Sequence, residues 1–69
     1  MKKTRVYIGK NLRNLRCKHN LKQKDVALFL GVSVAVYSSY ETDKHEPTLS
    51  DIIGLSELYN TTVDNILNI

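Results

Sequence analysis

The strongest constraint on the fold lies around Gly31, within the stretch LKQKDVALFLGVSVAVYSSYE. Small and apolar residues recur at helical spacing on both sides of this glycine, which predicts two short helices over about 23–30 and 33–42 joined by a tight turn. Gly31 suits the left-handed backbone conformation that ends a helix, because it has no Cβ to clash. Ser33 can cap the second helix with its hydroxyl. The stretch therefore predicts two helices that cross closely at one corner.

One helix is predicted before this pair and two after it, so the expected fold is all-α. Residues 7–19 place Ile8, Leu12 and Leu15 at i, i+4 and i+7, the spacing of one buried helix face. A chain of 69 residues can bury only one small core, which predicts a single domain over 1–69 and argues against an enzyme cleft.

The two helices predicted after Pro47 each begin at a threonine that can act as an N-cap. Thr48 begins the first, and Asp51, three residues later, is expected to complete a capping box. Thr62 begins the last, a short turn that closes the bottom of the core. The residues expected to face the core from these helices are Leu49, Ile52, Leu55, Tyr59, Val63, Ile66 and Leu67.

Charge and cysteine content narrow the class of function. The net charge is +3, and six of the ten basic residues precede Cys17. This distribution fits a polyanionic partner and a solvated helix face about equally well. Cys17 is the only cysteine, so no internal disulfide can form, and it is expected to pack at the end of the first helix.

Several classes of protein are not expected from these residues. No nucleophile with a base, carboxylate pair or phosphate-binding loop can be assembled, so the protein is not expected to be an enzyme. Without a Cys/His cluster, neither a metal nor another cofactor is expected. The basic N-terminus leads into no apolar segment, so we expect neither a signal peptide nor a membrane anchor, and a cytoplasmic location.

The stretch around Gly31 resembles the helix-turn-helix of the phage repressor and Cro family, the Xre type. Gln23 opens the first helix of the motif, and Ala27 is small where the two helices cross closely. The apolar residues that fall where the motif locks its helices together are Val26, Leu30, Val32, Tyr37 and Tyr40. The segments IGKNLRNLR, ETDKHEP and LSELYNTTVDNIL are similar to the family's first helix, loop and closing helices. The resemblance implies a compact five-helix, lambda-repressor-like bundle.

The same resemblance implies a transcriptional regulator, expected to be a repressor, that reads the major groove of duplex DNA with the helix over about 33–42. Gln23 resembles the family residue that contacts a DNA phosphate, and Lys44 and His45 lie in the loop that follows the DNA backbone. The family's common Asn-Gly is replaced by Thr42-Asp43, so Asp43 is expected to adopt the left-handed conformation itself. The residues implied to bind DNA are Gln23, Ser33, Val34, Ala35, Ser38, Ser39, Lys44 and His45.

This reading helix has few hydrogen-bond donors. Val34 and Ala35 can make only apolar contacts, and the strongly apolar group on a major-groove edge is the thymine methyl. We therefore expect T-rich half-sites, with much of the affinity supplied by phosphate contacts. The run Val34, Ala35, Val36 also fits a second class of function, a protein-interaction module that has lost the DNA-reading surface.

Two further features are implied by the resemblance or by the charge pattern. Arg16 and Glu41 match family residues that commonly form a largely buried ion pair between the first and third helices. Lys2, Lys3 and Arg5, within a basic segment over 1–6, fit either an arm that reaches the DNA groove or a frayed tail, of which the tail is favoured.

Apolar residues left over from the core predict a homodimer bound to an inverted repeat. Ile53 and Leu58 are surplus to the inward stripe and lie near Val63 and the terminal Ile69 in sequence. A two-fold contact would cover them and space two recognition helices by one turn of DNA, although a monomer with incidental exposed residues is the alternative. Switching is expected to depend on concentration, a regulatory protein partner or proteolysis.

Overall fold

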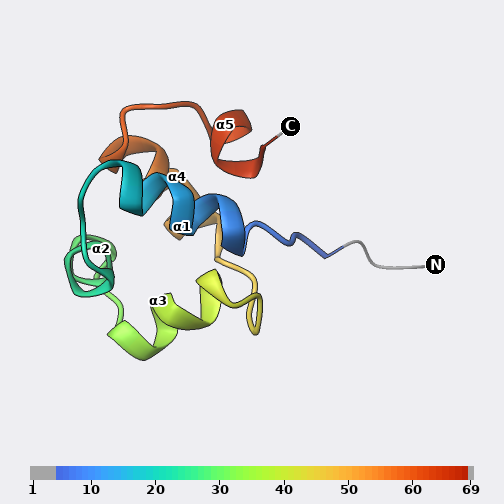
Figure 1. The fold of residues 1–69 in the computed structure, drawn as a ribbon. Helices are drawn as coiled ribbons and strands as arrows, with labels where there is room; N and C mark the ends of the chain where they lie inside the picture. Colours follow the sequence, from blue (N-terminus) through green and yellow to red (C-terminus); the bar gives the residue numbers. More distant parts are fainter. Residues whose placement is uncertain (1–4, 69) are drawn as a thin grey trace.

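The computed structural model describes residues 5–68, which form an all-helical bundle and contain no strand (Figure 1). The five helices are α1 (Gly9–Lys18), α2 (Gln23–Leu30), α3 (Val34–Glu41), α4 (Leu49–Leu58) and α5 (Val63–Leu67). The number and order of the predicted helices are confirmed. Where the sequence predicted the first or last residue of a helix, the observed boundary lies within about two residues of it.

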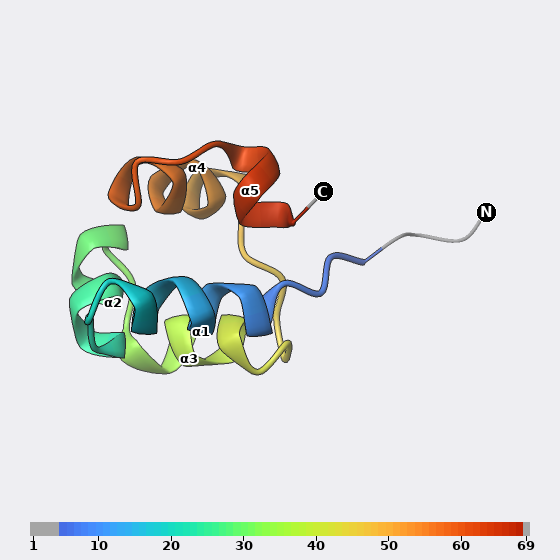
Figure 2. The same cartoon turned by 45° about the horizontal axis from the view of Figure 1, so that its top comes forward.

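The helices form two layers, with α1 and α3 in one and α4 and α5 in the other, while α2 closes one end (Figure 2). One core lies between the layers and receives side chains from all the helices and from Ile8 just before α1. Its buried apolar residues are Ile8, Leu12, Val26, Ala27, Tyr37, Tyr40, Ile52, Leu55, Tyr59 and Ile66. Val63 and Leu67, also predicted to face the core, are partly buried against it.

The predicted N-caps of the last three helices are confirmed. The side-chain oxygens of Ser33, Thr48 and Thr62 each accept a hydrogen bond from the backbone N–H three residues later, at 3.1 Å in every case. The capping box at Thr48 is different from the prediction. The Asp51 carboxylate is buried and accepts a hydrogen bond from the Tyr40 hydroxyl at 2.7 Å. It therefore joins α4 to α3 and does not bond to the backbone N–H of the cap residue.

Two predicted core positions are wrong. Leu49 is 70% exposed, because residues spaced by three rotate by about 60° per step around a helix, which places Leu49 about 120° from Leu55. Cys17 is exposed as well, since it lies about 140° around α1 from the buried Leu12. Both residues belong to the helices predicted for them, but they lie on the solvent-exposed side.

The helices of the described residues are also too short or too polar to cross a membrane.

Candidate nucleic-acid interface

The corner between α2 and α3 has the geometry of a tight helical turn. Gly31 adopts the left-handed conformation, with φ of 74°, and the Val32 N–H donates to the Ala27 carbonyl at 3.0 Å. Ala27 is 1% exposed, so the crossing leaves little room for a larger side chain at this position. Val26 is fully buried, and Val32 packs against the core from the turn. These contacts hold α3 in a fixed orientation against α2.

Helix α3 is divided into a buried and an exposed side. Tyr37 and Tyr40 pack in the core with their rings in an edge-to-face arrangement, 6.3 Å between centroids. Val34 is 46% exposed and Ala35 is exposed, which agrees with the outward orientation expected for both. Of the other residues expected to face outward, Ser33 is exposed and Ser38 and Ser39 are half-buried.

Two further residues belong to this exposed side: Val36, expected to be exposed but not listed among the DNA-binding residues, and Thr42, which was not expected there. Val36 is 41% exposed, and Thr42, the C-cap residue, is also exposed. Thr42 follows Ser38 by four residues, which places both on one face of the helix. Helical spacing could have identified Thr42, which lies about 140° from Tyr37 and about 160° from Tyr40, but not Val36, which is one helical turn before Tyr40.

The hydroxyl groups on this side are largely engaged with the helix itself. Ser39 Oγ donates to the Val36 carbonyl, and Thr42 Oγ1 donates to the Ser38 carbonyl at 3.1 Å. Ser33 Oγ accepts from the Val36 N–H as the cap. Ser33 keeps its own O–H when it accepts as the cap, so the outer side of α3 presents mainly methyl groups and hydroxyl oxygens, with the hydroxyls of Ser33 and Ser38 as its remaining donors.

A buried ion pair joins α1 to the end of α3, and a hydrogen bond ties the start of α2 to the same carboxylate. Arg16 and Glu41, the pair implied by the family resemblance, are joined by Nε–Oε2 at 2.6 Å and Nη2–Oε1 at 3.2 Å. Their side chains are 14% and 4% exposed. Gln23, half-buried as the first residue of α2, donates from Nε2 to Glu41 Oε1 at 3.1 Å.

The pKa values of this cluster follow from burial and pairing. Burial alone would raise the pKa of Glu41, but hydrogen bonds, with that from Arg16 the strongest, hold it below its ordinary value. The Glu41 carboxylate likewise raises the pKa of Arg16. Burial raises the pKa of Tyr59 to about 12, and its hydroxyl and that of Tyr37 have no hydrogen-bond partner among the described residues. The charged form of Glu41 is thus the favoured form in the folded protein.

The loop after α3 holds the Asp43 carboxylate against the start of α1. Asp43 adopts the left-handed conformation expected in place of glycine, with φ of 59°. Its Oδ1 accepts from the Gly9 N–H at 3.0 Å, so the carboxylate serves the N-terminus of α1. Lys44 and His45, expected to follow the DNA backbone, are exposed on the same loop. The basic members of the loop are therefore presented to solvent while its aspartate is held.

Residues 5 and 6 of the predicted basic arm contact this loop. The Arg5 guanidinium donates to the Asp43 carbonyl and lies over the Tyr7 ring, 4.9 Å from the centroid. The Val6 N–H donates to Glu46 Oε2 at 2.9 Å. Lys2 and Lys3 lie outside the described residues, so the choice between an arm and a frayed tail stays a prediction for them.

Gly9 permits the close approach of α1 to the end of α3, which the sequence analysis did not foresee. A Cβ at this position would lie 2.3 Å from the Glu41 carbonyl oxygen and 2.8 Å from that of Tyr40. Both atoms belong to the backbone, so neither can move aside as a side chain could. The need for glycine at position 9 cannot be recognised from the neighbouring residues, because they have the pattern of an ordinary helix start.

The residues predicted to form a dimer interface are only partly available. Ile53 is 44% exposed, whereas Leu58 and Val63 are half-buried against the core. Ile69 lies outside the described residues. Leu49 lies one helical turn before Ile53 and is the most exposed apolar residue of α4. The exposed apolar surface of α4 is therefore centred on Leu49 and Ile53, without Leu58.

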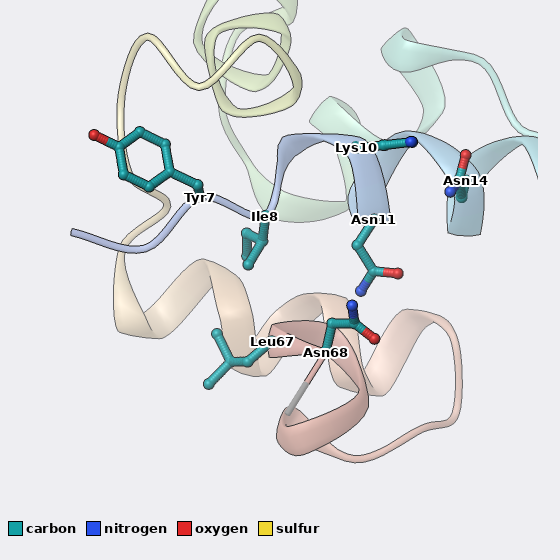
Figure 3. A pocket seen from close by; sticks show the side chains of 7 residues that line it. All are labelled: Tyr7, Ile8, Lys10, Asn11, Asn14, Leu67 and Asn68. Atoms are coloured by element: carbon teal, nitrogen blue, oxygen red, sulfur yellow. The ribbon is translucent and has the colours of Figure 1, made fainter. Parts of the chain in front are cut away.

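A separate groove of about 510 Å³ lies between the start of α1 and the end of α5 (Figure 3). None of its lining residues comes from α2 or α3. Asn11 stands at its edge and donates from Nδ2 to the carbonyls of Asn65 and Ile66, at 3.0 and 2.8 Å. The residues around the groove are Tyr7, Ile8, Lys10, Asn11, Asn14, Leu67 and Asn68. Among residues 5–68, no group of three or more His, Cys, Asp or Glu side chains could hold a metal ion, in this groove or elsewhere.

Comparison with known proteins gives consistent matches. Three proteins of Bacillus subtilis (strain 168) are similar to most of this chain. They are the "Uncharacterized HTH-type transcriptional regulator YobD" (34% identical over 58 residues), the "HTH-type transcriptional regulator ImmR" (35% over 60) and the "HTH-type transcriptional regulator AnsR" (34% over 56). The alignments cover 84%, 87% and 81% of this chain but 52%, 47% and 48% of the respective relatives. The chain thus spans about half the length of these relatives.

The family comparison covers the same region of the chain. The helix-turn-helix family matches residues 12–66, which extend from α1 to α5 and include the Gly31 corner. As the resemblance to phage repressors and Cro proteins predicted, the chain belongs to the helix-turn-helix family.

Proposed function

We propose that this chain binds duplex DNA, with α3 in the major groove, and regulates transcription as a repressor. The observation that carries the proposal is the division of α3, in which Tyr37 and Tyr40 fix the helix while the opposite side stays exposed. A helix held in this way at a tight corner can enter a major groove without losing core contacts. The names of the similar Bacillus proteins support the regulatory part of the proposal.

Phosphate contacts would come from two places on either side of α3. At the start of α2, Gln23 is flanked by the exposed Lys22 and Lys24, and the helix N-terminus itself favours an anion. Neither lysine was expected at the interface from sequence, although both adjoin Gln23. On the loop after α3, Lys44 and His45 are exposed. These groups can position the protein on the duplex without specifying bases.

Base recognition would depend on methyl contact. Val34 and Ala35 are exposed near the start of α3, and the internal hydrogen bonds of Ser39 and Thr42 leave few donors beside them. The bidentate contacts worth about 1–3 kcal/mol each that Arg or Gln makes to bases cannot form from such side chains. We therefore expect thymine-rich half-sites and a modest preference for specific over non-specific DNA.

Selection of bound duplexes from a random-sequence library tests the proposal. We expect a thymine-rich consensus, with Val34→Ala relaxing the preference at one thymine and Gln23→Ala weakening binding to all sequences alike. Affinity should fall steeply as salt concentration rises, because phosphate contacts release counterions. A guanine-dominated consensus that Val34→Ala leaves unchanged would contradict this mode of recognition.

A protein-interaction module is the second candidate function. It is favoured by the exposure of Val34 and Val36, because a run of exposed apolar side chains is costly unless another surface covers it. Binding through such a surface should be insensitive to salt or strengthened by it. Failure to enrich any duplex, together with a salt-insensitive protein partner, would favour this function over DNA binding.

A homodimer on an inverted repeat is part of the proposal. The exposed Leu49 and Ile53 of α4 provide apolar surface for a two-fold contact, while Leu58 and Val63 can contribute only their exposed parts. Such a contact would present two copies of α3 to successive major grooves, about 34–36 Å apart. A cytoplasmic site of action and switching through a regulatory protein partner belong to the same proposal, and no enzymatic role does.

A further inference from the structure

The Glu41 carboxylate connects α1 and the start of α2 to the end of α3, the helix of the proposed DNA surface. Its two oxygens accept hydrogen bonds from Nε and Nη2 of Arg16 and from Nε2 of Gln23, at donor–acceptor distances of 2.6–3.2 Å. Arg16 also donates from Nη1 to the Leu21 carbonyl at 3.0 Å, in the segment leading into α2. The side chain of Glu41 is only 4% exposed, so water competes little for these bonds. The end of α3 is thereby fixed to the start of α2.

The chemistry of the carboxylate determines which way the Gln23 amide faces. An ionised carboxylate can only accept hydrogen bonds, so the side-chain NH2 group of Gln23, and not its carbonyl oxygen, must face Glu41. One of the two amide protons is used in that bond. The second N–H has no hydrogen-bond partner among the described residues, and it is carried by the half-buried first residue of α2.

We propose that Glu41 is a positioning residue for DNA binding, because it holds the Gln23 side-chain amide so that its second N–H meets a DNA phosphate. This inference rests on the proposed function. It gives the ion pair a role beyond stability, since a freely rotating glutamine would have to lose side-chain entropy on binding. A preorganised donor keeps more of the energy of the contact.

The test uses a duplex that this protein selects from random sequences, with single phosphates replaced in turn by uncharged methylphosphonates. In the unmodified protein, we expect replacement of the phosphate contacted by Gln23 to weaken binding about tenfold, as for a hydrogen bond to a charged group. In Gln23→Ala, the same replacement should have almost no further effect. This pair of measurements identifies the phosphate.

The decisive variant removes the carboxylate while keeping the cluster neutral. The double substitution Arg16→Met with Glu41→Leu replaces the buried pair by apolar side chains, an exchange that folded proteins often tolerate. The folding of this variant is checked by circular dichroism. In it, we expect replacement of the identified phosphate to cause almost no further loss of DNA affinity, whereas replacement of the other contacted phosphates should weaken binding as before. An unchanged loss at that phosphate would overturn the inference. If the unmodified protein enriches no duplex at all, the proposed function fails first.

A measurement on the unmodified free protein covers the case in which the double variant does not fold. The NMR signals of the Gln23 side-chain NH2 group should shift as Glu41 becomes protonated in acid, because the bonded carboxylate loses its charge. Signals that do not move over the titration of Glu41 would overturn the inference. The side-chain NH2 signals of Asn14, an exposed amide on α1 outside the cluster, serve as the control.

Discussion

At the scale of single residues, the polar cluster around Glu41 is the most sensitive part of the molecule. Removing one member of a buried ion pair leaves the other charged and unpaired, which costs about 3–5 kcal/mol, whereas most surface substitutions stay within about 0.5 kcal/mol. We therefore expect Glu41→Ala to lower the free energy of unfolding far more than Glu57→Ala, which changes an exposed glutamate of α4. Chemical denaturation of both variants checks this, and equal losses would show that the pair contributes little.

The same cluster sets a dependence on acid. The folded-state pKa of Glu41 lies below its ordinary value of 4.5, so its contribution to stability is present above about pH 4.5 and is lost as the pH falls through the lowered pKa. We expect the difference in unfolding free energy between the unmodified protein and Glu41→Gln to be largest near neutral pH and to shrink in acid. A difference that is constant from pH 7 to pH 3 would contradict the lowered pKa.

Tyr59 should respond in the opposite direction. Its hydroxyl is buried without a partner among the described residues, so Tyr59→Phe should be neutral or slightly stabilising at pH 7. Burial raises its pKa from 10.0 to about 12, so the stabilising effect of the neutral form is complete below pH 10 and is lost as the pH rises through 12. Between pH 9 and pH 12, the free energy of unfolding should fall less for Tyr59→Phe than for the unmodified protein, as measured by chemical denaturation. An equal fall in the two proteins would argue against the raised pKa.

At the scale of helices, α1 receives its N-terminal acceptor from a distant loop. The N-cap residue Ile8 has no side-chain hydrogen bond to offer, and the Asp43 carboxylate accepts from the Gly9 N–H instead. Asp43→Ala should destabilise the protein by about 1 kcal/mol for the lost cap and about 1–2 kcal/mol more for alanine in the left-handed conformation. Thermal unfolding measures the sum.

Asp43→Asn is the matched variant for this position. Asparagine can keep the acceptor and adopts the left-handed conformation readily, so the stability should change little. The substitution also removes a negative charge beside Lys44 and His45, and affinity for duplex DNA should rise at low salt. An affinity of Asp43→Asn for DNA that does not rise at low salt would indicate that this loop does not face the phosphates.

The elements themselves were largely predictable from sequence, because caps and helical periods are local. Ser33, Thr48 and Thr62 lie directly before the segments they cap, and Gly31 marks the turn. Roles that depend on a distant partner were not predictable in this way. Asp51 accepts from Tyr40, and Gly9 is needed because the backbone of α3 approaches it, and neither partner can be read from neighbouring residues.

In the candidate site, too, features set by neighbouring residues or by the family resemblance were predictable, and contacts between distant residues were not. The family resemblance placed Val34 and Ala35 on the exposed side of α3, where they lie. Helical spacing alone gives Ala35, but Val34 is three residues from the buried Tyr37 and about 60° from it around the helix. Leu58 was expected at the surface, but α4 turns it towards the core, where it is half-buried. The hydrogen bond from Gln23 to Glu41 depends on how three helices meet, and no pattern in the sequence contains that information.

At the scale of the whole molecule, the proposed dimer depends on the exposed apolar surface of α4. Leu49→Glu together with Ile53→Glu would place two carboxylates at a two-fold contact, where they meet their own copies and repel. We expect this variant to sediment as a monomer at micromolar concentration while its unfolding free energy stays close to that of the unmodified protein, since both side chains are exposed.

The control for this prediction is Leu28→Glu, which changes the most exposed large apolar residue of the described chain, on α2. It should leave the association state unchanged. Sedimentation of the unmodified protein only as a monomer, both free and on an inverted-repeat duplex, would remove the dimer from the proposal.

The division of α3 also has a consequence for how this protein can evolve. The side that anchors the helix is formed by Tyr37 and Tyr40, while Val34 and Ala35 make no contribution to the buried core. Selection for a new operator can therefore act on positions 34 and 35 with little penalty in folding. A lineage that duplicates such a gene can change its target without first acquiring a stabilising substitution, and the same freedom makes these positions the natural ones to randomise in an engineered repressor.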